Sequence, residues 1–177
     1  MSKPPATPYP PDLAEDATPA TELGAGPWSE LVDIVVEKAD GANEPAVRSK
    51  LLRTELRGCR LTGADLGESS LIDVTFADCK LDLLGFRFAS LRRVAFVDCV
   101  MPEADFYAAR LEDVLFEGCE LREATFSEAR LERVELRGCD LAGLRGIEAL
   151  RGIRMPWVDV IQNAGLFAGA LAIEILD

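Results

Sequence analysis

The sequence predicts an all-β solenoid whose chain turns a corner every five residues and closes a four-sided coil every twenty. The first observation is an unbroken series of nineteen large apolar residues, spaced five apart from Leu51 to Leu141. A five-residue step would scatter these side chains over every face of an α-helix and alternate them across the two faces of a strand. The chain must therefore bend at each step to keep them inside.

The second observation is a period of twenty residues. All five cysteines lie twenty residues apart, each two residues before a central apolar position: Cys59, Cys79, Cys99, Cys119 and Cys139. Three central positions, Phe76, Phe96 and Phe116, share the same period. Four sides of five residues therefore make one coil, and the nineteen repeats make about five coils stacked at the spacing of neighbouring strands, about 4.8 Å.

The cysteine and phenylalanine columns are predicted to be structural core. The cysteines are odd in number and evenly spaced, with no CxxC pair and no histidine in the chain. This pattern is typical of small buried residues and not of a disulfide framework, a zinc site or a redox centre. Outward glycines, such as Gly58 and Gly118, suit corners that need a positive φ.

Several units resemble the A(D/N)LXX repeat of the pentapeptide repeat proteins, for example Ala64-Asp65-Leu66, Ala104-Asp105-Phe106 and Cys139-Asp140-Leu141. The resemblance covers about residues 46–147. It implies a right-handed quadrilateral β-helix, which we expect to carry a C-terminal helical cap.

The segments flanking the repeats lack the five-residue period. Residues 1–27 are rich in Pro, Ala, Thr and acids, and they are predicted to be a disordered leader. Residues 28–45 are predicted to be an N-terminal cap and linker, because the open end of a solenoid needs cover. Residues 46–147 form the β-helix. Residues 148–177 are predicted to be a C-terminal cap, with a helix that starts near Pro156 and a short terminal strand.

The net charge of −12 limits the classes of partner. Residues 1–45 contribute −7, residues 46–147 contribute −3 and residues 148–177 contribute −2. An acidic chain meets phosphate with the wrong sign, so direct nucleic-acid binding is not expected. No apolar run is long enough for a membrane span and no secretory signal precedes the repeats, so we expect a cytoplasmic protein without membrane contact.

The sequence shows no catalytic set, no metal-ligand cluster and no phosphate-binding loop, so we expect neither enzymatic activity nor a cofactor. The leading interpretation is a scaffold or protein-binding module with rigid, flat β-helix faces and an unidentified protein partner. Candidate contact residues are Phe88 and Tyr107, which point outward on one side of successive coils, although isolated apolar residues are common on protein surfaces. The others are Trp157, Leu166 and Phe167, which either cover the last coil or join two copies as a homodimer.

The family resemblance also implies an alternative function. Some pentapeptide repeat proteins imitate DNA and bind a type II topoisomerase such as gyrase, which they modulate or protect from inhibitors. A DNA mimic needs a continuous acidic stripe. Here the outward acids alternate with arginines, for example Arg92, Arg93 and Arg133, which favours the binding-module interpretation.

Overall fold

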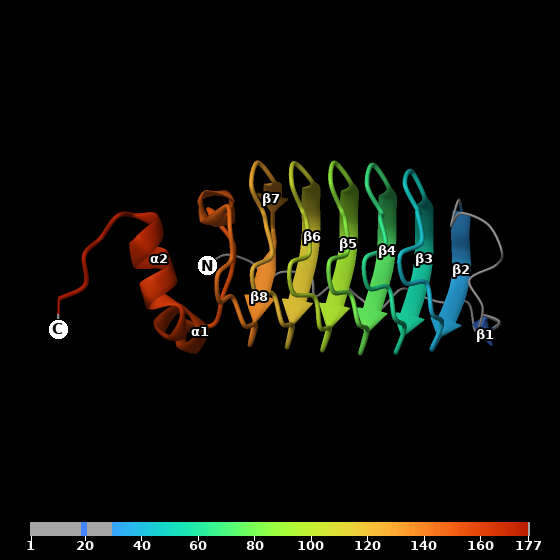
Figure 1. Cartoon of the computed structure of the whole chain (residues 1–177), viewed down its shortest axis with the longest axis horizontal. Coiled ribbons are helices and arrows are strands. Elements are labelled where there is room, and N and C mark those ends of the chain that lie inside the picture. Colours follow the sequence, from blue (N-terminus) through green and yellow to red (C-terminus); the bar gives the residue numbers. More distant parts are fainter. Residues whose placement is uncertain (1–18, 21–29, 177) are drawn as a thin grey trace, which may run out of the picture.

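The chain winds into a parallel β-solenoid that ends in two short helices (Figure 1). The structure is a computed structural model that describes residues 19–20 and 30–176; most of the predicted leader lies outside the described residues. Its strands form one sheet along the rod: β1 (Pro19–Ala20), β2 (Glu30–Glu37), β3 (Lys50–Arg57), β4 (Ser70–Ala77), β5 (Ser90–Val97), β6 (Arg110–Glu117), β7 (Arg130–Glu132) and β8 (Glu135–Arg137).

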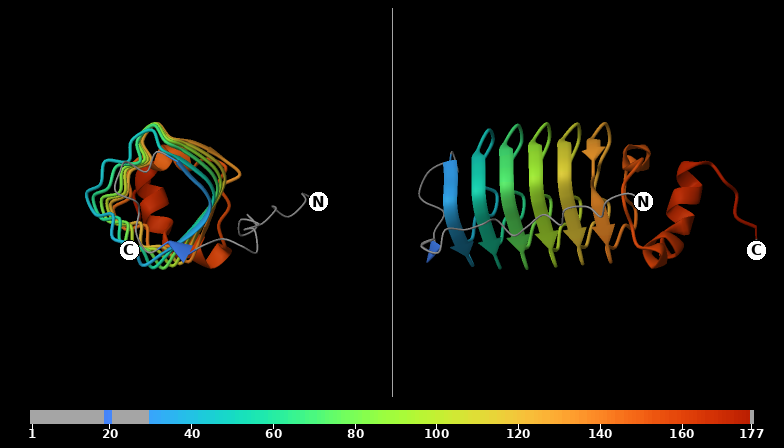
Figure 2. Two further views of the ribbon diagram at one scale, coloured as in Figure 1. Left: turned by 90° about the vertical axis from the view of Figure 1, so that its right-hand side faces the viewer. Right: turned by 180° about the vertical axis from the view of Figure 1, so that it is seen from behind.

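Successive coils pair in parallel at the predicted offset of twenty residues. Phe96 in β5 lies opposite both Phe76 in β4 and Phe116 in β6. Viewed along the rod, the coils superimpose into a closed outline around the interior (Figure 2). The predicted all-β solenoid with a C-terminal helical cap is confirmed.

Left-handed residues make the corners. The residue two positions after each centre has a positive φ, from 47° at Arg53 to 70° at Gly63. Glycine takes this conformation without strain, whereas an ordinary residue such as Asp73, with φ of 56°, accepts a cost of about 1 kcal/mol. Hydrogen bonds between coils offset that cost, as at Leu83, Phe88 and Gly118, whose amides donate to carbonyls of the next coil.

Two phenylalanine columns fill the centre of the solenoid, and all six rings are buried: Phe76, Phe86, Phe96, Phe106, Phe116 and Phe126. Within a column the rings stack at 4.8–4.9 Å, and between columns they meet edge to face at 5.7–6.5 Å. Both are favourable geometries for aromatic pairs.

The cysteine column is free of disulfides. Cys59, Cys79, Cys99 and Cys119 are buried and Cys139 is half-buried. Hydrogen bonding with neighbouring thiols and burial together raise the pKa of Cys59 and Cys99, so these two thiols are protonated at neutral pH.

The solenoid starts earlier than predicted. Strand β2 lies within residues 28–45, the expected cap and linker, and pairs in register with β3 through Leu31 and Leu51. The pattern was hidden because the next two centres hold Gly41 and Ala46, which are buried but small. Strand β1 adds two residues to the outer edge of β2, beside Val35.

The C-terminal segment departs from the twenty-residue period. A 3₁₀ turn, η1 (Ile147–Leu150), follows Gly146, and the next bridge joins Glu135 to Arg154 at an offset of nineteen. Two short helices, α1 (Trp157–Gln162) and α2 (Ala164–Ala170), then replace the single predicted helix. Residues 171–176 form no strand, contrary to the expected terminal strand. No helix in the described part of the chain is long and apolar enough to cross a membrane.

Candidate protein-contact surfaces

One side of the rod carries a cluster that we call the aromatic patch, formed by Leu83, Arg87, Phe88 and Tyr107. The ring of Phe88 meets that of Tyr107 edge to face, with centroids 5.7 Å apart. The Phe88 side chain is 58% exposed and Leu83 is 55% exposed. The structure therefore brings the two predicted residues together, and it places a second exposed apolar side chain, Leu83, at the preceding corner of the same coil.

The corners of one coil place these side chains. Leu83 and Phe88 both have a φ of 58°, and in the described chain they are the only large apolar residues at left-handed corners. The Phe88 amide donates to the Tyr107 carbonyl of the next coil at 3.0 Å, which brings the two residues side by side. Neither exposed side chain contributes to the core, so packing does not explain them.

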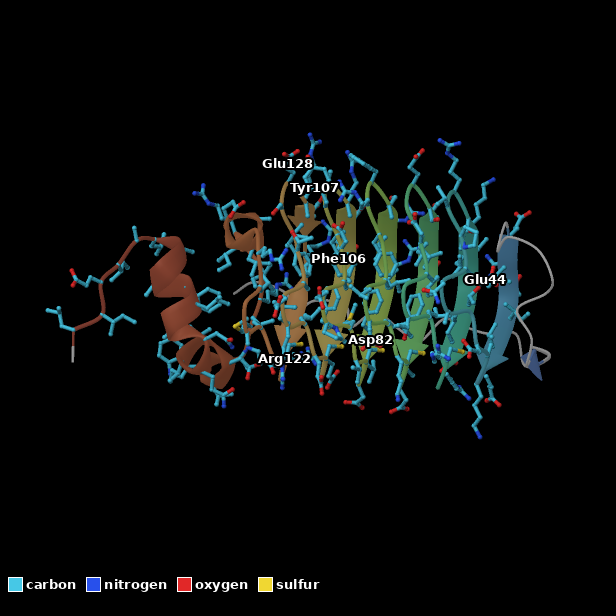
Figure 3. The ribbon with its side chains drawn as sticks, viewed as in Figure 1. Glu44, Asp82, Phe106, Tyr107, Arg122 and Glu128 are labelled. Atoms are coloured by element: carbon cyan, nitrogen blue, oxygen red, sulfur yellow. The ribbon has the colours of Figure 1, made fainter. Side chains whose placement is uncertain are left out.

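Charged groups surround the Tyr107 ring. The Arg87 guanidinium lies 4.7 Å from its centroid, within cation–π range, and Arg87 Nη1 donates to Asp105 Oδ2 at 2.9 Å. Asp105 also accepts a hydrogen bond from the Tyr107 amide at 2.8 Å. Glu128 lies at the same edge of the rod (Figure 3), and its hydrogen bond and negative charge raise the pKa of the Tyr107 phenol. The ring is thus held in one orientation.

Two arginines next to the patch have no acidic partner among residues 30–176. Arg110 follows Tyr107 by three residues and lies in register with Arg130 on the next coil. With Glu112, Leu131 and Glu132 they line a cleft of about 370 Å³. Sequence analysis missed this pair, because whether an arginine is neutralised depends on the coils above and below it.

Another corner of the solenoid is neutralised throughout. Its residues alternate strictly between acid and base: Asp33, Arg53, Asp73, Arg93, Asp113 and Arg133. Nε of Arg93 lies 2.5 Å from Asp73, and Nε of Arg133 lies 2.5 Å from Asp113. Hydrogen bonding from these guanidinium groups lowers the pKa of both carboxyls. We call this column the ionic ladder.

The C-terminal helices present a second apolar region. Trp157 is 75% exposed, whereas Leu166 and Phe167 are half-buried against the core, so only the first of these three predicted residues is free for contact. Phe167 also lines a cleft of about 380 Å³ between η1 and the helices. We define the C-terminal apolar surface by its exposed side chains: Trp157, Val158, Ile161, Leu171, Ile173, Ile175 and Leu176.

A buried carboxylate anchors these helices on the solenoid. Asp159 of α1 is buried, and its Oδ2 accepts a hydrogen bond from the Gly138 amide at 2.7 Å. Among the residues described, no group of three or more His, Cys, Asp or Glu side chains is placed to hold a metal ion.

The sequence matches a profile described as the pentapeptide repeat region over residues 49–126 and 69–145. Together the two matches span residues 49–145, more than half of the 177 residues. The chain belongs to the pentapeptide repeat family. Comparison with curated proteins returns no match.

Several solved structures are similar to this pentapeptide repeat protein. One is a trypsin-treated variant of QnrB1, a plasmid-mediated fluoroquinolone resistance protein: TM-score 0.37, 18% identity, 91% of this chain and 99% of that one. Another is HetL from Nostoc sp. strain PCC 7120, a pentapeptide repeat protein involved in heterocyst differentiation regulation: TM-score 0.25, 15% identity, 75% and 93% covered. A third is Rfr23 from Cyanothece 51142: TM-score 0.25, 17% identity, 73% and 86% covered. At these values the likenesses carry no inference about a partner.

Proposed function

We propose that this pentapeptide repeat protein is a non-enzymatic, cytoplasmic protein-binding module that contacts its partner through the aromatic patch. The observation that carries the proposal is the exposed Phe88 side chain next to the fixed ring of Tyr107, with exposed Leu83 at the preceding corner of the same coil. Covering an exposed Phe side chain contributes about 1.5–3 kcal/mol, and aromatic and Arg side chains supply most of the energy at protein interfaces.

Quantitative affinity purification with the intact chain tests this proposal. Proteins captured by the wild-type chain and by Val32→Ala, a truncation of an exposed apolar residue on β2, should be lost with Phe88→Ala. Capture of the same proteins by Phe88→Ala would exclude the patch as the contact surface. Thermal unfolding of both variants, followed by circular dichroism, separates a contact effect from a folding defect.

The C-terminal apolar surface supports a further part of the proposal, a homodimer. Unpartnered apolar side chains of this extent are unusual on a monomer, and a surface that pairs with its own copy is the commonest solution. Light scattering should give about twice the 19.2 kDa chain mass. Trp157→Glu should return the mass to that of one chain. An unchanged mass for the variant would place the dimer contact elsewhere.

A second candidate is a DNA mimic that binds a type II topoisomerase. It is favoured by one group of acids without ion pairs in the described chain, on successive coils: Asp78, Asp98, Glu103, Glu117 and Glu120. The group extends over two coil spacings, about 10 Å, or about three base pairs of DNA. It is therefore short for a duplex mimic. A supercoiling assay with purified gyrase at micromolar protein tests it, and an unchanged rate would exclude it.

A further inference from the structure

We propose that the cleft at Arg110 and Arg130 is an oxyanion site that binds a phosphoryl group, carried by a small phosphate monoester or by a phosphorylated side chain of a protein. The two arginines lie in register on β6 and β7, and with Glu112, Leu131 and Glu132 they line the cleft of about 370 Å³. Small-molecule sites in proteins have volumes of this order, about 300–1,000 Å³. The proposal goes beyond the protein-binding function proposed above and does not depend on the aromatic patch.

The first observation is a pair of stacked positive charges without acidic partners. Arg110 and Arg130 are both exposed and lie one coil apart, about 4.8 Å. Arg60 and Lys80 are also cations in register, but Arg60 Nη1 lies 2.7 Å from Asp40 Oδ2. Among residues 30–176, Arg110 and Arg130 are thus the only two cations in register of which neither makes an ion pair. An anion bound between them relieves the repulsion of the two charges.

The acids that line the cleft are bonded to a third arginine. Arg133 Nη2 donates to Glu112 Oε1 at 2.7 Å, and Arg133 Nη1 donates to Glu132 Oε1. On β3 an arginine does pair with the glutamate two residues away, since Arg57 Nε donates to Glu55 Oε1 at 2.6 Å. The two cleft arginines have the same spacing from Glu112 and Glu132, but Arg133 holds those carboxylates. Their guanidinium groups are therefore left for an external anion.

The neighbours of the pair leave both guanidinium groups accessible. Ser90 lies in register with Arg110 on β5, and its exposed hydroxyl is a further donor beside the pair. Glu128, two residues before Arg130, is hydrogen-bonded to the Tyr107 phenol, whose pKa it raises. In the described sheet no strand pairs with the outer edge of β7, and the chain forms η1 after it. An anion can therefore approach both arginines from outside.

A phosphoryl group matches the charge and the spacing of the pair. Each guanidinium presents a planar fork of N–H donors, which binds two oxygens of a carboxylate or phosphate. A phosphate monoester carries a charge of about −1.5 to −2 near pH 7 and three terminal oxygens, so one group can accept from both forks across the coil spacing of about 4.8 Å. A single carboxylate has one charge and two oxygens, and it would leave the second arginine unneutralised.

Both arginines stand on strands that are fixed by hydrogen bonds to the preceding coil. The Arg110 amide donates to the Ala89 carbonyl at 2.9 Å, and the Arg130 amide donates to the Ala109 carbonyl at 2.9 Å. A site on strands is positioned more precisely than a site on loops, so binding orders only side chains. Removal of either fork takes away charge-assisted hydrogen bonds and should weaken binding about tenfold or more.

NMR of the arginine Nε–H groups in the full-length protein, labelled with ¹⁵N-arginine, tests the site. The probes are inorganic phosphate, a glycine pentapeptide with a central phosphoserine, and the same peptide with serine or glutamate at its centre. Phosphate and the phosphopeptide should shift two Nε–H resonances, which Arg110→Gln and Arg130→Gln identify by their loss. Each of these variants should raise the dissociation constant about tenfold or more. The matched control, Lys80→Gln, removes an exposed cation without an ion pair in the described chain from another side of the coil, and should change the constant by less than about twofold.

The relative affinities separate the two sources of the phosphoryl group. Tighter binding of the phosphopeptide than of inorganic phosphate assigns the site to a phosphorylated side chain, and equal or weaker binding assigns it to a small phosphate monoester. Three results would overturn the inference. The first is no shift with either phosphate probe in the wild-type chain, which needs no variant to fold. The second is an equal affinity for the glutamate peptide, which would make the cleft a carboxylate site. The third is an equal loss of affinity in Lys80→Gln, which would show attraction to charge alone.

Discussion

Replacement of Phe106 by leucine should remove a ring that, like Phe96, contacts four other rings of the core. Phe106 stacks on Phe86 at 4.9 Å and on Phe126 at 4.8 Å, and meets Phe96 and Phe116 edge to face at 6.3 and 5.7 Å. Leu66 occupies the same central position two coils earlier, so the backbone accepts this side chain without rearrangement. The substitution therefore tests the ring contacts and not the fold.

The expected loss follows from the number of ring pairs. An aromatic pair contributes about 0.5–1.5 kcal/mol beyond area burial, and leucine restores part of the apolar contact. At about 0.5–1 kcal/mol each, four lost pairs should cost about 2–4 kcal/mol of unfolding free energy. The matched control is Phe126→Leu, which is equally buried but loses only two pairs, with Phe106 and Phe116, and should cost about 1–2 kcal/mol.

Urea unfolding followed by circular dichroism measures both variants. An unchanged m-value would show that the compared states are the same, so the shift in midpoint reports stability. The Phe106 variant should lose about twice the free energy of the Phe126 variant. Equal losses, or a larger loss at Phe126, would refute the reasoning, because the phenylalanine columns would then act only by filling volume.

Three further substitutions test the corner, the ionic ladder and the cap. Gly146→Ala places a Cβ 2.3 Å from a backbone nitrogen of the neighbouring coil, so it should lower the unfolding free energy by more than about 2 kcal/mol. The control Gly138→Ala, in open space at a φ of 59°, should lower it by only about 1 kcal/mol. Equal losses for the two variants would exclude the clash at Gly146. The bond from Arg93 lowers the pKa of Asp73, so its stabilisation is present above the unfolded pKa of about 3.9 and is lost as the pH falls through the folded value. Asp73→Asn should therefore lower the unfolding free energy at pH 7 by less than about 1 kcal/mol, measured from the urea midpoint. The variant should also lose less stability than the wild type on acidification. An unaltered dependence of stability on pH would contradict this reasoning. Asp159→Ala leaves the Gly138 amide without its acceptor, so it should lower the unfolding free energy by about 1–3 kcal/mol. Hydrogen exchange should become faster in α1 but not in β4. Unchanged exchange in α1 would show that another contact anchors the helices.

Most of this fold can be predicted from the sequence, because each five-residue repeat contains the residues that determine its own conformation. A large apolar centre marks the inward side of every five-residue unit, and the cysteine column counts the sides of a coil. The same rule failed in the coil that begins with β2, because Gly41 and Ala46 take the two central positions that follow the strand. Those two sides pair with the next coil through the bridges Asp40–Arg60 and Pro45–Asp65, so a small centre is tolerated there although it carries no apolar signal.

The candidate contact surfaces could be predicted only in part from the sequence. Phe88 and Tyr107 could be placed on one side by counting residues, because a twenty-residue offset returns the chain to the same column. The C-terminal helices could not be divided into covering and exposed residues, since that depends on how α1 and α2 meet the last coil. Trp157 is exposed and Phe167 is half-buried for this reason, although both are large and apolar in the same predicted helix.

The corner position explains how one repetitive fold can carry different surfaces. Stability depends on the centre of each repeat and on the residue two before it, because these side chains fill the interior. The corner residue has the same left-handed conformation whatever its side chain, so it can change without altering the coil. At one corner this freedom gives the ionic ladder from Asp33 to Arg133, which cancels its own charge. At two other corners it gives Leu83 and Phe88, whose side chains are exposed and do not pack in the core. In a solenoid of this kind, an apolar residue at a left-handed corner is therefore better evidence of a binding surface than an apolar residue on a flat side.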